Sequence, residues 1–181
     1  GIADAERVAI TGQSHGSWLG PMVVGTHPEF AAASFAEGWG NTISLYGQMP
    51  GWLNVNVHEH HSGNPYENTQ DYLEASPIFL VGDAGVPMML EFGEDSGAEQ
   101  GLELATALWR HAVPHELVIY PETGHNIEKP RMTLDSMDRN LDWIEFWVRG
   151  VRDTSSEKQT RYERWEMMRR DEMVTPAEVW K

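Results

Sequence analysis

The chain contains no cysteine and no long apolar run, and each absence excludes a class of protein. Without cysteine among its 181 residues, it has no disulfides, no thiolate metal ligands and no thiol nucleophile. A membrane-spanning helix needs about 20 predominantly apolar residues, and no such run occurs. No signal-peptide pattern opens the sequence. We expect a soluble protein, cytoplasmic or periplasmic if it is bacterial, and the sequence leaves the compartment open.

Basic residues are also scarce. Lys and Arg number 13 against 28 Asp and Glu, which gives a formal net charge of -15 at pH 7. Residues 150–181 hold seven charges of each sign, so the whole acidic excess lies in residues 1–149. A field of this sign repels nucleic-acid backbones and anionic membranes, so we expect neither as a partner. It favours neutral or cationic substrates, or serves solubility alone.

Four short apolar segments predict buried strands, and segments of helical length separate them. Strands are expected at 7–11, 31–38, 86–92 and 115–121. Helices are expected at 14–27, 97–112, 132–150 and 161–170. Strands that alternate with helices favour parallel βαβ units and therefore an α/β fold. The long connection over 39–76 is expected to be functional or to carry short helices.

Periodicity predicts which helix faces point inward. For 97–112 the inward side is expected to carry Leu102, Ala105, Leu108 and Trp109. For 132–150 it is expected to carry Leu134, Met137, Leu141, Ile144 and Trp147 or Val148. This helix should end at Gly150, a residue typical of C-caps. In 161–170 we expect Tyr162, Trp165 and Met168 or Arg169 on alternating faces.

The stretch RVAITGQSHGSWLG has the form G-x-S-x-G between a predicted strand and a predicted helix. This pattern is typical of a strained turn that holds a nucleophilic serine, here Ser14, above the end of a sheet. Gly12 and Gly16 are expected to remove Cβ atoms that would clash with neighbouring elements. The backbone N–H of His15 is then aimed at a developing oxyanion. The alternative is an ordinary turn from strand to helix.

An α/β-hydrolase places an acid and then a histidine after later strands. His125 directly follows the last predicted strand, so we expect it to be the general base. Asp95 follows the third predicted strand and is the expected acid, with Glu94 as a rival one residue away. Asp83 lies before that strand, at the wrong end of the sheet.

Three segments of the chain resemble the C-terminal half of the hydrolase domain in the prolyl oligopeptidase family. They are RVAITGQSHGSW…HPEFAAASFAEG, VPMMLEFGED…EQGLELATALW and HELVIYPETGHNIEKPR…RNLDWIEFWV. The resemblance implies an α/β-hydrolase fold with about four strands in this chain, a serine peptidase without a cofactor, and a triad of Ser14, Asp95 and His125. The end of the chain is similar to the branch that includes lasso peptide isopeptidases.

Two departures from the family pattern occur. Ser17 stands where many members have glycine, and Asp95 comes two residues after Gly93, where many members have the acid three residues after the glycine. The shortened loop weakens the assignment of Asp95 more than that of the serine or the histidine. An esterase of the same fold, or a catalytically silent binding homologue, remains an alternative to a peptidase or isopeptidase.

The resemblance also implies a larger assembly. Residues 1–150 correspond to the catalytic half-domain, and 151–181 are expected to form a linker and a C-terminal docking helix. Strand 7–11 would be a bare apolar edge if the chain were alone, which native proteins avoid. The expected partners are therefore a peptide substrate and the N-terminal part of the same precursor, comprising the rest of the hydrolase domain and a β-propeller.

The connection after the second strand supplies candidate binding residues. Trp39, Tyr46 and Trp52 could line a substrate pocket, as aromatic residues of this region do in the family, or they could simply pack. His58 and His60 have no clear third ligand, so no metal site is expected there.

Overall fold

The computed structural model describes residues 4–49, 51 and 63–170. Its centre is a four-stranded sheet whose strands are β1 (Ala9–Gln13), β2 (Ala32–Ala36), β3 (Met88–Gly93) and β4 (His115–Tyr120). The spatial order is β1-β2-β3-β4, and every neighbouring pair is parallel. The predicted α/β fold is confirmed, although β1 begins two residues later than expected.

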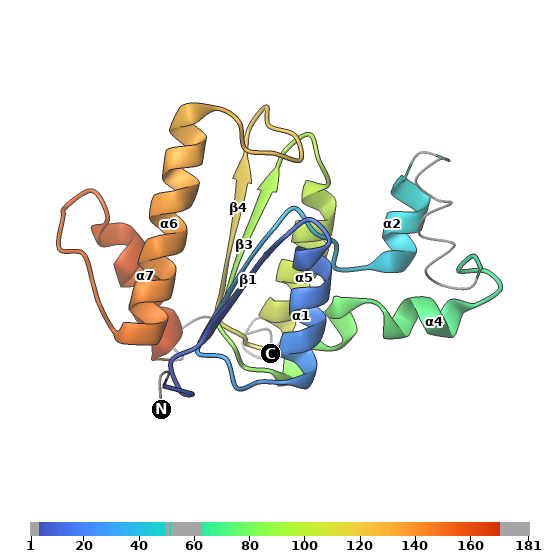
Figure 1. Cartoon of the computed structure of the whole chain (residues 1–181), viewed down its shortest axis with the longest axis horizontal. Coiled ribbons are helices and arrows are strands. Elements are labelled where there is room, and N and C mark those ends of the chain that lie inside the picture. Colours follow the sequence, from blue (N-terminus) through green and yellow to red (C-terminus); the bar gives the residue numbers. More distant parts are fainter. Residues whose placement is uncertain (1–3, 50, 52–62, 171–181) are drawn as a thin grey trace, which may run out of the picture.

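Helices cover both faces of the sheet (Figure 1). The helices α1 (Gly16–Thr26) and α5 (Ala98–Arg110) lie on one face, and α6 (Pro130–Arg149) and α7 (Gln159–Arg169) lie on the other. The connection from β2 to β3 carries short helices, as expected. They are α2 (Thr42–Gln48), α4 (Thr69–Glu74), η1 (Pro77–Phe79) and η2 (Val81–Asp83).

Side-chain alternation along β3 divides the interior into two clusters. Met88, Leu90 and Phe92 pack with residues of α1 and α5. Met89 packs with the aromatic residues of α6 and α7, and Glu91 points to the same side, toward α6. All six residues of β3 are buried because helices cover the strand on both faces.

The predicted inward face of α6 is correct only in its second half: Ile144, Trp147 and Val148 are partly buried against the core, but the first three expected residues are not. Leu134, Met137 and Leu141 are 68%, 65% and 61% exposed. Trp143 and Phe146 are buried instead. This helix carries apolar residues on more than one side. It is oriented so that the rings of Trp143 and Phe146 pack against the sheet and α7, which leaves Leu134, Met137 and Leu141 exposed. The expected end of the helix is confirmed, since Gly150 has a φ of +67°.

Two smaller expectations are met in part or fail. In α5, Ala105 and Leu108 are buried as expected and Trp109 is half-buried, but Leu102 is 52% exposed. In α7, Tyr162, Trp165 and Met168 are all buried together, not on alternating faces. Residues three apart in a helix share a side, so this face docks as a unit against α6 and the sheet.

Within the part of the chain that the structure describes, β1 is an edge strand that pairs only with β2. Val8, just before it, is 39% exposed. An open pocket of about 460 Å³ lies beside Val8 and Ala9 and is also lined by Val148 and Arg149 at the end of α6. None of the described helices is long and apolar enough to cross a membrane.

Trp165 is the largest of the buried residues through which α7 docks. Trp165 is fully buried, and its indole N–H donates to Glu116. Trp165→Ala is expected to lower the free energy of unfolding by about 3–5 kcal/mol, because it leaves a cavity and an unpaired acceptor. Met167→Ala, on the 42% exposed side of the same helix, should change it by less than about 0.5 kcal/mol. Urea unfolding measures both, and equal effects would contradict this packing.

Candidate active site

Ser14 occupies a strained turn between β1 and α1. Its φ is +56°, a left-handed conformation that is uncommon for residues other than glycine. Its backbone N–H donates to the Ala36 carbonyl at 2.9 Å, so the turn is fixed against the end of β2. The G-x-S-x-G segment therefore has the conformation that the sequence predicted.

The two glycines of the motif contribute differently. A Cβ on Gly12 would collide with the carbonyl group of Gly16, so Gly12 has the role that the sequence predicted. A Cβ on Gly16 would meet nothing within 4 Å among the described residues, so a steric reason for this second glycine is not confirmed there. The backbone of Gly16 approaches Gly12 closely, and the absence of a Cβ at Gly12 is sufficient to allow this approach.

His125 lies in the loop between β4 and α6, and its Nε2 is 2.9 Å from Ser14 Oγ. The loop is held at its base, because Thr133 Oγ1 donates to the Ile127 carbonyl at 2.6 Å. Lys129 also pairs with Glu122 across the loop at 2.8 Å. The structure thus brings together the two candidate catalytic residues that the sequence identified 111 positions apart.

The carboxylate that lies against His125 is that of Glu37, not Asp95. Glu37 Oε2 is 3.4 Å from His125 Nδ1, and the glutamate side chain is 1% exposed. Asp95 is exposed, and its carboxylate makes no hydrogen bond among the described residues. The carboxylate of its rival Glu94 instead accepts the backbone N–H of Glu122 at 3.0 Å.

Glu37 directly follows β2 and has a φ of +59°. Glu37 lies within the strand expected at 31–38, so the sequence did not single it out as a site residue. One local signal was present, since Glu37 is a single carboxylate at the end of the strand AASFA and before Gly38. Its contact with His125 could not be predicted locally, because His125 is remote from Glu37 in the sequence.

Aromatic residues gather beside Ser14. The rings of Trp18 and Trp39 stack at 5.5 Å, and both meet the ring of His15 edge to face, at 5.0 and 5.9 Å. Tyr46 belongs to a different group, with edge contacts to Tyr66 and Tyr72. Of the three expected pocket residues, Trp39 therefore lies near the nucleophile turn, Tyr46 packs against α4, and Trp52 lies outside the described residues.

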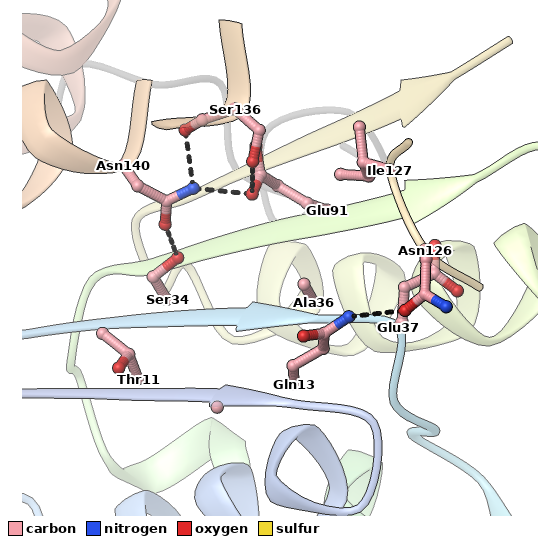
Figure 2. Close-up of a pocket in the computed structure, with 11 residues that line it drawn as sticks. Thr11, Gln13, Ser34, Ala36, Glu37, Glu91, Asn126, Ile127, Ser136 and Asn140 are labelled. Carbon is pink, nitrogen blue, oxygen red and sulfur yellow. Dashed lines mark hydrogen bonds between the residues drawn. The ribbon is translucent and has the colours of Figure 1, made fainter. Parts of the chain in front are cut away.

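A polar cavity of about 480 Å³ extends from the turn toward α6 (Figure 2). It is lined by Thr11, Gly12, Gln13, Ser34, Ala36, Glu37, Glu91, Asn126, Ile127, Ser136 and Asn140. Gln13 reaches Asn126 at 3.4 Å, which links the end of β1 to the loop of His125. No group of three or more His, Asp or Glu side chains able to hold a metal ion occurs among the described residues. His58 and His60 lie outside them.

Glu91 is a second buried acid of this cavity, in addition to Glu37. It accepts hydrogen bonds from Tyr120, Ser136 and Asn140 at 2.9, 2.8 and 2.6 Å. Burial raises the pKa of the Glu91 carboxyl, and these hydrogen bonds oppose the rise without cancelling it. Burial and the adjacent Glu91 likewise raise the pKa of Tyr120. The surroundings of Glu91 and Tyr120 therefore favour the neutral form of each of these two side chains.

Comparisons with known proteins identify the family and the fold. A model of the prolyl oligopeptidase family matches residues 1–150. The acylamino-acid-releasing enzyme of Mus musculus is 30% identical over 155 residues, which cover 78% of this chain and 20% of that protein. Lasso peptide isopeptidase AtxE2 of Asticcacaulis excentricus is 26% identical over 187 residues, which cover 98% of this chain and 26% of that protein.

Solved structures give the same fold. A variant of the AtxE2 isopeptidase with Astexin3-dC4 bound aligns with a TM-score of 0.81 at 22% identity, covering 95% of this chain and 26% of that one. The uncomplexed acylaminoacyl peptidase of Pyrococcus horikoshii aligns with a TM-score of 0.77 at 20% identity, covering 87% and 27%. The sheet and its helices are thus part of an α/β-hydrolase fold, and the chain spans about a fifth to a quarter of these relatives.

The raised pKa of Glu91 predicts a pH dependence of stability. A carboxyl whose pKa rises on folding binds its proton more tightly in the folded state, so stability falls as the pH increases from the unfolded value through the folded one. The free energy of unfolding of the parent should therefore fall relative to that of Glu91→Gln as the pH rises above the ordinary value of 4.5. Urea unfolding on both sides of this pH tests it, and a difference that is independent of pH would contradict it.

Proposed function

Because the chain belongs to the prolyl oligopeptidase family, we propose that it is the catalytic C-terminal half of a serine peptidase domain that cleaves amide bonds. The observation that carries the proposal is the 2.9 Å contact between Ser14 Oγ and His125 Nε2 at a strained strand-to-helix turn. A nucleophile and a base within hydrogen-bond reach are the required core of acyl transfer by serine.

The proposed reaction follows from these positions. Ser14 Oγ attacks the carbonyl carbon of the scissile amide while its proton passes to His125 Nε2. The backbone N–H of His15, at the start of α1, stabilises the oxyanion. His125 then gives the proton to the leaving amine, and water repeats the sequence to release the acid and restore Ser14.

The proposed substrates are short or conformationally restricted peptides. Trp39 and Trp18, stacked beside His15, supply an apolar wall next to the nucleophile. The similarity to a lasso peptide isopeptidase spans 98% of the chain, so it includes α7 as well as the catalytic elements. This extent supports an isopeptidase-like activity on amide bonds in constrained peptides.

The proposal also includes a missing neighbour. Among the described residues, the unpaired edge of β1 and the exposed Leu134, Met137 and Leu141 of α6 are both the kind of surface that native proteins normally cover. We propose that the upstream half of the hydrolase domain, in the same precursor, covers it and contributes the second oxyanion donor. A β-propeller in that precursor would restrict access to small or flexible substrates.

The nucleophile is tested by covalent labelling. A fluorophosphonate probe should label the full-length protein at Ser14, and Ser14→Ala should abolish labelling and lower kcat on a peptide substrate by about 10⁶. Ser17→Ala is the matched control, since this buried serine lies one turn further along the chain. Labelling that survives in Ser14→Ala would refute the assignment. Retained labelling without amide cleavage in the parent would point to an esterase.

The missing neighbour is tested by complementation. Residues 1–181 alone should aggregate or remain inactive, because the outer edge of β1 has no partner strand among the described residues and the loss of one oxyanion donor costs about 10²–10³ in rate. Co-expression with the upstream half should restore a monodisperse, active complex, which size-exclusion chromatography and probe labelling would detect. A monomeric and fully active 181-residue product would contradict the proposal.

A further inference from the structure

We propose that Glu37, at the end of β2, is the carboxylate that orients His125, and that the loop after β3 holds Glu37 in position instead of supplying the acid itself. This inference rests on the proposed function, since it assigns the third group of the same site. The sequence predicted the acid after β3, whereas this inference assigns it to the end of the neighbouring strand β2.

The position of Glu37 meets the requirements of that role. Its Oε2 lies 3.4 Å from His125 Nδ1, the ring nitrogen that faces away from Ser14. Its side chain is almost completely buried, whereas the His125 side chain is 50% exposed. At 3.4 Å this is an ion-pair contact and not a formed hydrogen bond, and catalytic contacts are often long in a free enzyme and shorten when substrate binds. A buried carboxylate also interacts more strongly with a developing imidazolium than an exposed one does.

Residues after β3 fix the glutamate carboxylate on both oxygens. The backbone N–H of Gly93 donates to Oε1, and the Ser96 hydroxyl donates to Oε2 at 2.7 Å. The backbone N–H of Glu37 donates to the Glu91 carbonyl at 2.9 Å, which anchors its main chain to β3. Because a carboxylate oxygen accepts more than one hydrogen bond, Oε2 can accept from Ser96 and from His125 Nδ1 together.

The other acids of the shortened loop have different partners. The Glu94 carboxylate accepts the Glu122 backbone N–H. Asp95 donates its own backbone N–H to the Thr123 carbonyl at 3.0 Å, and its side chain is exposed. The same loop therefore supplies hydrogen-bond donors to Glu37 at Gly93 and Ser96, and no carboxylate to His125.

The consequence for the reaction is a fixed tautomer. When Glu37 accepts the Nδ1–H of His125, Nε2 carries its lone pair toward Ser14 and can take the hydroxyl proton. As the Ser14 oxygen bonds to the substrate carbonyl carbon, that proton moves to Nε2 and the imidazolium forms beside the Glu37 carboxylate. Glu37 keeps its negative charge throughout and is a positioning residue.

Paired substitutions in the full-length protein test the inference. Glu37→Gln should lower kcat by about 10⁴ with little change in KM, as expected when the imidazole tautomer is no longer fixed. Asp95→Asn should leave kcat close to that of the parent. Glu37→Asp should lie between these two, because its carboxylate is withdrawn by one methylene. Circular dichroism and thermal unfolding establish that each variant is folded.

Chemical rescue separates positioning from a purely structural role. Glu37 lines the polar cavity, whose rim residues Gln13 and Asn126 are exposed, so a small anion has a route to the vacated place. Added formate should restore part of the kcat of Glu37→Ala, and neutral formamide should not. Formate should have no effect on Asp95→Asn.

The outcomes distinguish this inference from the proposed function. If Ser14→Ala abolishes activity while Asp95→Asn is the more damaging acid substitution, the inference is overturned and the peptidase assignment stands. The inference is also overturned if Glu37→Gln is inactive but formate fails to rescue Glu37→Ala. It is likewise overturned if the loss of activity in Glu37→Gln is accompanied by a loss of folding. If Ser14→Ala is fully active, the proposed function itself fails.

Discussion

The backbone hydrogen bonds at the carboxyl ends of the parallel strands determine the rest of this site. Beyond the regular pairing of Gln13 with Ala36, the Ser14 N–H donates to the Ala36 carbonyl, and the Glu37 N–H donates to the Glu91 carbonyl. The pattern thus continues for one residue past β1 and β2. In parallel strands all carboxyl ends lie at one edge of the sheet, so these hydrogen bonds bring the serine and the glutamate, 23 positions apart in the sequence, to the same edge.

The fourth strand contributes differently, through a loop whose ends are fixed. The loop of His125 begins at the end of β4 and runs into α6, and hydrogen bonds from Thr133 to Ile127 and from Gln13 to Asn126 hold it near β1. Helix α6 is in turn attached to the sheet by Asn140, which bridges Ser34 and the buried Glu91. The position of the histidine therefore depends on polar contacts between α6 and the middle of the sheet as well as on its own loop.

The sequence predicted the features that arise from local chemistry and missed those that depend on distant partners. The turn at Ser14 follows from the spacing of Gly12 and from the apolar strand before it, and His125 follows from its place after the last strand. The buried side of α6 could not be predicted in this way, because Trp143 and Leu141 are both apolar, and it is contacts with the sheet and with the docked α7 that favour Trp143. Glu37 is a similar case, since nothing in its own segment specifies the imidazole that it meets.

A carboxylate can orient His125 from either of two neighbouring strand ends, because the imidazole responds to the distance and burial of the charge and not to its place in the chain. In this protein the loop after β3 is short, and its Gly93 N–H and Ser96 hydroxyl are directed at the end of β2. An aspartate in that loop is turned toward solvent, where water weakens its interaction with a charged ring. Glu37, directly after β2, reaches the imidazole from the neighbouring strand end, and hydrogen bonds from Gly93 and Ser96 hold its carboxylate in the interior. Orientation of the histidine by a carboxylate therefore remains available when the acid follows β2 instead of β3.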